Sequence, residues 1–543
     1  MIGRAAVVAG VCVAVLAVQR GTARAQADER DRFYVDKDDE DRDKTLWQGS
    51  LTSSSFYFAE SGVAGTTYGG MVPPDNGSPF ARMWTELRAQ LDGRHLKGGR
   101  WDARIDARAR VVPNPYDQGN ADPARPQAGL FGENEYELRE LYVVRGGRRS
   151  DLFFGRQVIA DLGAIKIDGV RLDYAKNRRW TYLGFAGLYP LRGSRSITTD
   201  YAPGIDKANQ PTGRVMPATG GFGGAYRTQN SYGALGAVAI VPTSRDGGYG
   251  GTGTYERPRL YVAANGYWRR SPALDVWHYF IVDLYGSAGT AATNASGGFQ
   301  WKPSPRLRFQ LWANHLSTEA LNVQVREQLE NEAILDGVVV NNVKVQRIGT
   351  TAARAAVSAL LGKGRRFELT AALQGRRRPD VVLEAGAVDQ PLPAAKSLDL
   401  HVQAVDREFY GGLRLEGTFI RTIGLGDASY ARSTAQIVRL GASRELKDGK
   451  AQVMGDLSWV TTADDNATMQ CLPGQVTTCY GSANSTALQA NATGYYRWKR
   501  DWFVTGALGV GTQKLIVTNL SGGGVPQATT LIGQAFLRIG YKF

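Results

Sequence analysis

One stretch of the sequence limits the possible folds more than any other, because its two faces differ completely in chemistry. The stretch is W-D-A-R-I-D-A-R-A-R-V at residues 101–111. Successive side chains of a β-strand point to opposite faces, so one face here holds only Trp, Ala, Ile and Val and the other only Asp and Arg. A transmembrane β-barrel shows this alternation, with the apolar face toward lipid and the charged face toward a water-filled lumen.

The preceding stretch has the same alternation and completes a predicted hairpin. One of its faces holds Ala81, Met83, Thr85, Leu87, Ala89 and Leu91, and the other holds Arg82, Trp84, Glu86, Arg88 and Gln90. A turn at residues 92–99 joins the two stretches. Beyond the N-terminus no apolar run is long enough for a transmembrane helix, and the mean hydropathy of −0.29 fits an alternating barrel.

The N-terminus predicts export and a short lead-in. Residues 1–25 have a charged start at Arg4, an apolar run and an A-x-A cleavage site, which are the parts of a secretory signal peptide. Residues 26–45 carry an acidic run at 36–43 and are predicted to be a solvated periplasmic segment. Calcium binding and docking of a basic periplasmic partner are the alternatives for this run. The segment is too short for a plug domain, so residues 46–543 are assigned to the barrel.

The spacing of turns predicts the number of strands. From residue 46 onward, eleven long connections, one of them at residues 160–169, alternate with ten short ones, one of them around Asp406. This implies 22 antiparallel strands, with the longer loops outside and the short turns in the periplasm. An 18-strand barrel is the main alternative, because residues 220–232 and 291–298 alternate weakly. Glu140 shares a face with Leu138 and Tyr142, which indicates a bulge or an interfacial position. Tryptophans near the short turns predict an aromatic girdle; these are Trp101, Trp180, Trp268, Trp301, Trp498 and Trp502.

Two sequence features resemble known families. The last stretch, L-I-G-Q-A-F-L-R-I-G-Y-K-F at 531–543, resembles the closing strand by which the assembly machinery of Gram-negative outer membranes recognises β-barrels. The segments L-R-E-L-Y, F-F-G-R-Q and G-V-R-L-D-Y within residues 137–174 resemble paired strands of porins and of alginate-export-like barrels. The first resemblance implies an outer-membrane location in a Gram-negative cell. The second implies pore-lining roles for Arg139, Arg156 and Arg171.

The inward face is predicted to carry an excess of arginine. The arginines chosen as pore-lining are Arg82, Arg88, Arg104, Arg108, Arg110, Arg139, Arg156, Arg171, Arg366 and Arg414, and Arg308 and Arg376 also point inward. The inward carboxylates are Glu86, Asp102, Asp106, Glu137, Asp173, Glu368, Asp399 and Glu416. These charges either pair across strands and stiffen the wall or form arginine rings that favour anions, and both can hold together.

Function is therefore expected from the lumen and the loops. The first hypothesis is a channel that passes anionic solutes or exports an acidic polysaccharide. The alternative is a structural barrel that anchors a secretion, adhesion or surface-motility complex through periplasmic or surface protein partners. The net charge of +14 suits lipid phosphates and anionic solutes, and no nucleic-acid partner is expected.

The remaining expectations concern loops and chemistry. Residues 317–337 repeat apolar side chains at helical spacing and are predicted to form a short amphipathic helix, which either constricts the pore or lies on the surface. Cys471 and Cys479 are predicted to form a disulfide within an outer loop. An enzyme is not expected, because the four histidines lie in no catalytic motif, although His315 lies near the start of a long loop. No metal or cofactor is predicted.

Overall fold

The computed structural model describes most of the chain from residue 45 onward. The described ranges are 45–61, 80–113, 134–190, 197, 200–201, 203–205, 211–214, 216–241, 258–286, 290–317, 349–385, 388–392, 394–425, 433–446, 449–464, 480–519 and 528–543. The predicted signal peptide, nearly all of the acidic lead-in, all of the 317–337 helix except Ser317, and Cys471 and Cys479 lie outside these ranges.

Twenty-two strands form one closed antiparallel sheet. The first half consists of β1 (Leu46–Glu60), β2 (Phe80–His95), β3 (Trp101–Val111), β4 (Glu135–Gly146), β5 (Ser150–Ile159), β6 (Ile165–Ala175), β7 (Trp180–Leu188), β10 (Ala218–Arg227), β11 (Ser231–Val241), β12 (Arg259–Ser271) and β13 (Leu274–Tyr285). The second half consists of β14 (Ala291–Ser304), β15 (Leu307–Leu316), β16 (Thr350–Leu361), β17 (Phe367–Arg378), β20 (Ala395–Tyr410), β21 (Leu413–Gly424), β22 (Ser433–Leu446), β23 (Ala451–Asp464), β24 (Tyr480–Tyr496), β25 (Trp502–Asn519) and β26 (Ala528–Lys542). Each strand pairs with its neighbours along the chain, and β1 pairs with both β2 and β26, so the sheet closes.

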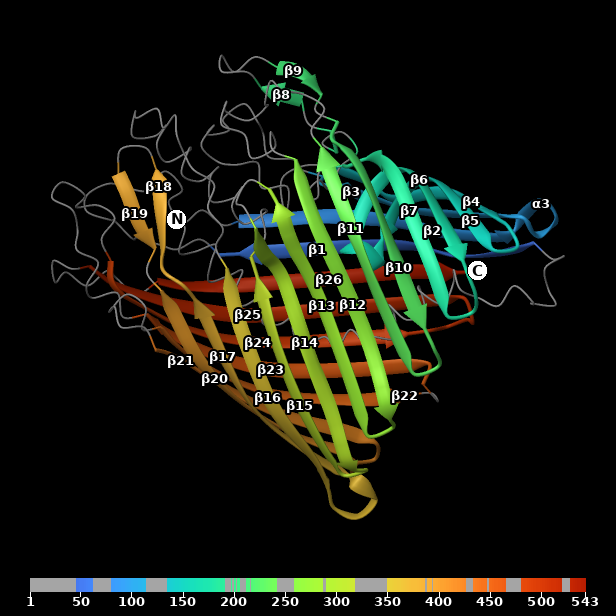
Figure 1. Cartoon of the computed structure of the whole chain (residues 1–543). Helices are drawn as coiled ribbons and strands as arrows, with labels where there is room; N and C mark the ends of the chain where they lie inside the picture. The colour runs from blue at the N-terminus through green and yellow to red at the C-terminus, as the bar shows by residue number, and fades with distance from the viewer. Residues whose placement is uncertain are drawn as a thin grey trace.

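Few other elements accompany the barrel in the described ranges. Two small hairpins lie in connections, β8 (Pro203–Ile205) with β9 (Pro211–Arg214) and β18 (Val381–Ala385) with β19 (Val388–Leu392). Figure 1 shows both at the end of the barrel opposite the short turns. The helical elements are α3 (Leu96–Gly99) and two single 3-10 turns, η2 (Ala160–Leu162) and η3 (Lys363–Arg365). Among the described residues, no helix combines the length and the apolar character required to cross a membrane.

The strand count and the alternation of connections agree with the prediction. Ten short turns join the strands at one end of the barrel, and the connections at the other end are mostly longer. The two weak stretches are both strands, β10 and β14, so the chain has 22 strands and the 18-strand alternative is wrong. The turn expected around Asp406 lies a few residues later, at Gly411 and Gly412, where both glycines have positive φ.

The two faces of the wall differ as the sequence predicts. Large apolar side chains on the outer face are exposed, among them Leu51, Leu87, Phe222, Leu235 and Leu508. A closed sheet leaves no open edge, so an apolar outer face suits hydrocarbon. Among the six girdle tryptophans, five are exposed on this face near the short turns: Trp180, Trp268, Trp301, Trp498 and Trp502.

The irregular position of Glu140 is explained by a β-bulge. Asp106 of β3 lies opposite Glu140, but the next residue, Ala107, lies opposite Leu138, so Arg139 has no opposite partner on β3. An extra residue of this kind turns the side chains that follow to the other face. Glu140 therefore points to the charged inner face together with Asp106, and the bulge interpretation is confirmed.

One expected long loop is a folded hairpin tip. The sequence predicted a loop at residues 160–169, but β5 continues to Ile159 and β6 begins at Ile165, with only η2 and a tight turn between them. Gly163 and Ala164 both have positive φ, which allows the sharp reversal. The prediction was wrong because the apolar residues of this segment are buried by contacts with strands far away in the sequence.

Candidate functional site

Charged side chains on the inner face of β2, β3 and β4 form several close ion pairs, and this set is called here the ion ladder. Arg88 donates two hydrogen bonds to Asp106, at 2.9 and 2.7 Å. Arg104 lies 2.5 Å from Glu140. Arg108 lies within 3.0 Å of Glu137 and also contacts Glu86 and Glu135, and Arg110 contacts the same two glutamates. Guanidinium groups bind carboxylates with two parallel bonds, so the ion ladder stiffens the wall.

The other predicted pore-lining arginines also lie near carboxylates. The pairs are Arg139 with Glu137, Arg156 with Asp168 and Asp200, Arg171 with Asp173, Arg366 with Asp406, and Arg414 with Glu416. Arg366 differs in place, since it precedes β17 at the short-turn end of the barrel. Arg82 belongs to β2, but its side chain is outside the described set. The structure thus brings arginines and carboxylates together rather than forming rings of arginine alone.

Three further ion pairs consist of an exposed arginine above a buried carboxylate. These are Arg376 over Asp399, Arg407 over Glu368, and Arg139 near Asp106. The arginine side chains are 46–61% exposed, while the carboxylate side chains are only 5–7% exposed. The carboxylates therefore lie against the wall and the guanidinium groups face the solvent of the lumen.

The hairpin tip, defined as residues 157–167, packs on the inner face of β11, β12 and β13. Leu162 is 1% exposed and forms a cluster with Val238 of β11 and Ala263 of β12. Side-chain and backbone hydrogen bonds hold the tip in place, because Tyr232 donates to the Asp161 carboxylate and Asn265 donates to the Asp161 carbonyl at 3.2 Å. The tip is therefore a fixed part of the lumen.

Glycines of the wall make room for this packing. A Cβ added at Gly236 or Gly223 would collide with the Leu162 side chain. Larger residues at these two positions would hold the tip away from β10 and β11. Close approach of this kind is a common reason for glycine inside a strand.

Truncating Leu162 tests the attachment of the tip. Leu162→Ala removes a buried side chain, which costs about 2–5 kcal/mol, so we expect the tip to detach and single-channel conductance to rise. Trypsin cleavage at Lys166 reports detachment independently. Val158→Ala is the matched control, because Val158 belongs to the same tip but is 36% exposed. Equal conductance and equal cleavage in both variants would show that the tip does not narrow the lumen.

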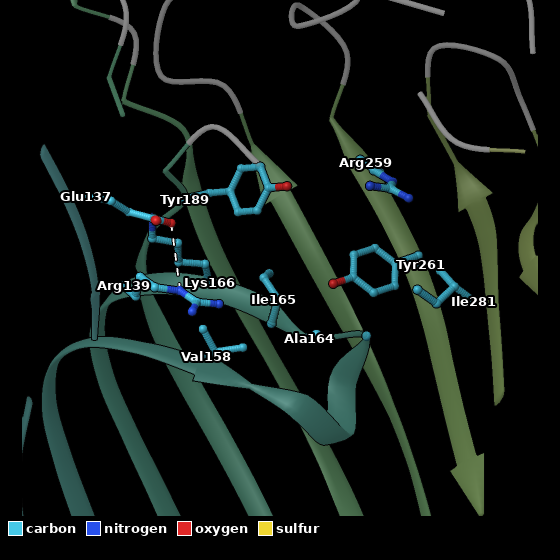
Figure 2. Close-up of a pocket in the computed structure, with 11 residues that line it drawn as sticks. Glu137, Arg139, Val158, Ala164, Ile165, Lys166, Tyr189, Arg259, Tyr261 and Ile281 are labelled. Atoms are coloured by element: carbon cyan, nitrogen blue, oxygen red, sulfur yellow. Dashed lines mark ion pairs between the residues drawn. The ribbon is translucent and has the colours of Figure 1, made fainter. Parts of the chain in front are cut away.

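A polar cavity of about 190 Å³ lies beside the tip (Figure 2). Its cationic lining residues are Arg139 of β4, Lys166 of β6 and Arg259 of β12, and Glu137 is the acidic one. Arg139 and Glu137 lie 3.9 Å apart, which is a loose ion pair. The rest of the lining consists of Tyr189, Tyr261 and five apolar residues, Val158, Gly163, Ala164, Ile165 and Ile281. Lys166 lies 3.6 Å from Asp200, and Arg259 lies 3.0 Å from Asp283. Arg139 has the longest carboxylate contacts of the three cations, so it is the one best placed to bind a small anion.

The wall next to this cavity contains a seam, defined as the stretch where β4 and β5 separate. The two strands pair only from Leu141 to Gly146 of β4. Beyond that point, Arg156 donates a hydrogen bond to the Leu138 carbonyl at 3.1 Å, and the Ile197 amide donates to the Tyr136 carbonyl at 2.8 Å. A side chain and a connecting segment therefore replace the strand as hydrogen-bond partners of the β4 edge.

Arg156 connects the seam to the tip and to the β7–β10 connection. It forms two bonds of 2.6 Å with Asp168 and a further ion pair with Asp200, whose side chain is 3% exposed. Tyr201 donates a hydrogen bond to Asp168 at 2.6 Å. Burial, together with the Asp168 carboxylate, raises the pKa of Tyr201, so its hydroxyl stays protonated and remains a donor. This network fixes the seam in the closed arrangement.

Sequence reasoning missed several residues of this site. It did not identify Lys166, Tyr189, Arg259, Asp200 or Tyr201, because they come from a predicted loop and from strands distant in the sequence. The bulge at Arg139 was the one local signal in this region. This irregular strand lies in a part of the sequence that is rich in arginine.

His315, the histidine near the start of a long loop, lies close to a threonine hydroxyl. The distance from the imidazole Nδ1 to the Thr351 hydroxyl is 2.8 Å. Within the described residues, no group of His, Cys, Asp and Glu has an arrangement that suits a metal ion.

Comparisons with known proteins give only distant structural similarity. No protein-family model and no curated protein matches the chain. The crystal structure of Pseudomonas aeruginosa OccK2 (OpdF) is 9% identical, with a TM-score of 0.35 over 92% of this chain and 98% of that one. The siderophore receptor PirA from Pseudomonas aeruginosa is 7% identical, with a TM-score of 0.46 over 91% and 80%. A bacterial polysaccharide outer membrane secretin is 10% identical, with a TM-score of 0.29 over 67% and 98%.

These values are too low to carry a functional argument, so the classification depends on the chain itself. The sheet closes between β1 and β26, and its outer face is apolar with aromatic residues near the short turns. Its inner face carries the ion ladder. By these features the chain is an outer-membrane β-barrel.

Proposed function

We propose that this barrel is a channel of the Gram-negative outer membrane that passes anionic solutes, including acidic sugars and their polymers. The proposal rests on the exposed position of lumenal arginines. Arg376 and Arg407 reach into the solvent, whereas their partners Asp399 and Glu368 are buried beneath them. A solute in the lumen therefore meets guanidinium groups before it meets carboxylates.

This arrangement separates two roles of the same ion pairs. The buried carboxylates keep the long arginine side chains in place and stiffen the wall. The exposed guanidinium groups lower the barrier for carboxylate, sulfate or phosphate groups, as rings of basic side chains do in anion pores. Pairing reduces the net field, so the expected preference is for anions over cations rather than exclusion of cations.

The strongest selection between solutes is proposed to take place beside the hairpin tip. The tip occupies part of the lumen, and the cavity next to it is lined by Arg139, Lys166 and Arg259. An anion that passes along this wall meets three cations within one small cavity. The lining tyrosines offer hydroxyl groups and ring surface to a sugar.

Liposome swelling with matched sugars tests the proposal. Glucuronate, glucose and glucosamine have similar size but carry negative, zero and positive charge. We expect proteoliposomes to admit glucuronate fastest and glucosamine slowest, and the difference to shrink at high salt because exposed charges are screened. Equal rates for the three sugars would indicate a channel without charge preference. No swelling with folded protein would favour the anchoring role instead.

The proposed partners follow from the location. The apolar outer face contacts outer-membrane lipid, and the closing strand with its terminal Phe543 is proposed to engage the barrel-assembly machinery. Docking of periplasmic or surface proteins on the acidic segment at residues 36–43 also stays a proposal.

A further inference from the structure

The outer face of the barrel carries an apolar groove directly across the wall from the Arg139 cavity. The groove measures about 770 Å³, within the usual range of about 300–1,000 Å³ for ligand pockets. Small side chains at Ala89, Ala107 and Ala109 form part of its lining, and its larger lining residues are Leu51, Leu87, Tyr136, Leu138, Ile197, Trp502, Ile539 and Tyr541. A hollow of this size on a lipid-facing wall suits an alkyl chain.

The groove and the cavity adjoin at the seam. Glu137 lines both of them, from the two sides of β4. Its neighbour Leu138 lines the groove, while Arg139, the bulged residue, lines the cavity. The residues of one short segment therefore face an apolar outer hollow and a cationic inner one.

The seam is the place where the wall is held without strand pairing. The β4 edge is closed there by the Arg156 side chain and by the Ile197 amide. Ile197 also lines the groove and is 47% exposed. A ligand that crosses the wall here must displace these two groups, and the paired part of β4 and β5, from Leu141 to Gly146, is not involved.

We propose that the seam binds a single-chain anionic amphiphile of the fatty-acid class. The alkyl chain lies in the outer groove, and the carboxylate reaches the cavity, where Arg139 and Lys166 bind it. Arg139 is suited to this role because its side chain is 48% exposed and its carboxylate contacts are long, at 3.9 and 4.0 Å. A carboxylate of the ligand replaces these weak contacts with charge-assisted hydrogen bonds. This site shares Arg139 and the cavity with the proposed channel, but ligand binding is measured without ion flow, so the two proposals can fail separately.

Charge and chain length decide between this ligand and others. The cavity of about 190 Å³ has room for a carboxylate and offers cations to it. An uncharged ester of the same chain lacks the group that Arg139 recognises. A membrane phospholipid has a second alkyl chain and a larger head group. A second copy of the barrel has no alkyl chain to fill the groove.

The test measures binding of cis-parinaric acid by fluorescence to the full barrel in phosphatidylcholine nanodiscs, with palmitate as competitor. We expect Arg139→Gln to weaken binding about tenfold, since it removes a charge-assisted bond, and Ala109→Trp to abolish it by filling the groove. Arg414→Gln is the control for the first change, because Arg414 is 47% exposed at a distant ion pair. Ala264→Trp is the control for the second, since Ala264 lies opposite the outward-facing Leu235 and does not line the groove.

The competing occupants give different results. Displacement of the probe by phosphatidate but not by palmitate would assign the groove to a membrane lipid and overturn the proposal. If methyl palmitate displaced the probe as effectively as palmitate does, Arg139 would have no role in recognising the carboxylate. A change of oligomeric state in Ala109→Trp would assign the groove to a second copy of the chain. Binding that all four variants leave unchanged would contradict the site, whatever the channel conducts.

Discussion

Replacing Arg156 with leucine is expected to lower the free energy of unfolding by about 3–5 kcal/mol, because the change leaves buried carboxylates without their partner. Arg156 is 8% exposed and pairs with Asp168 and with the nearly inaccessible Asp200. It also donates to the Leu138 carbonyl at the β4 edge. The same substitution should therefore open the seam, and we expect larger and noisier single-channel currents. We also expect the midpoint of unfolding to move to a lower urea concentration.

The matched control is Arg308→Leu. Arg308 pairs with Glu368, which keeps Arg407 as a second partner at 2.7 Å when Arg308 is removed. The loss of stability in this variant should be much smaller, and the noise of the single-channel currents should not increase. Equal destabilisation in the two variants would mean that the Arg156 network is one ion pair among many and not the closure of the seam.

Removing the exposed arginines is expected to reverse the ion preference. The triple substitution Arg139→Gln, Arg376→Gln and Arg407→Gln removes three exposed positive charges and uncovers Asp399. Asp106 keeps Arg88 as a partner, and Glu368 keeps Arg308. A unit charge about 4 Å from an ion is worth about 1 kcal/mol in water, which corresponds to a factor of about five in relative permeability. We therefore expect the anion-to-cation permeability ratio to fall at least fivefold and to pass below unity.

A change of charge on the other face controls for this result. Arg377 and Lys396 are opposite one another in the register and alternate with the inward residues Arg376 and Ser397. Arg377→Gln with Lys396→Gln should leave the permeability ratio unchanged. A triple variant that keeps the wild-type ratio would show that selectivity comes from another part of the chain.

Much of the fold could be predicted because period-two alternation is a local property. Residues 101–111 show both faces of β3 without reference to other strands. The count of 22 followed from turn spacing, and the irregularity at Arg139 was visible because simple alternation places Glu140 on the same face as Leu138. Each of these signals lies within a few residues of sequence.

The hairpin tip could not be predicted because its stability comes from distant strands. Ile159, Ile165 and Ile167 look like an ordinary apolar strand end, and nothing local shows that they pack on β11 to β13. The Arg156 network joins residues up to 44 positions apart. Sequence reasoning selected Arg156 as pore-lining, but its contacts with Asp168, Asp200 and the β4 edge depend on tertiary structure.

The candidate site was predicted in composition and not in arrangement. The excess of inward arginine was predicted from the sequence, and the ion ladder contains four of the ten arginines selected from it. Which member of each pair is buried depends on side-chain length and on packing against the wall. The exposed guanidinium over a buried carboxylate, which supports the proposed selectivity, became visible only in three dimensions.

The most direct test of the proposed function is the reversal potential of the purified barrel in a planar bilayer under a potassium chloride gradient. The proposal predicts stable conductance steps whose reversal potential is shifted toward the equilibrium potential of chloride. This shift of the reversal potential should be smaller at high salt. Cation-selective steps, or a silent bilayer from correctly folded protein, would contradict it.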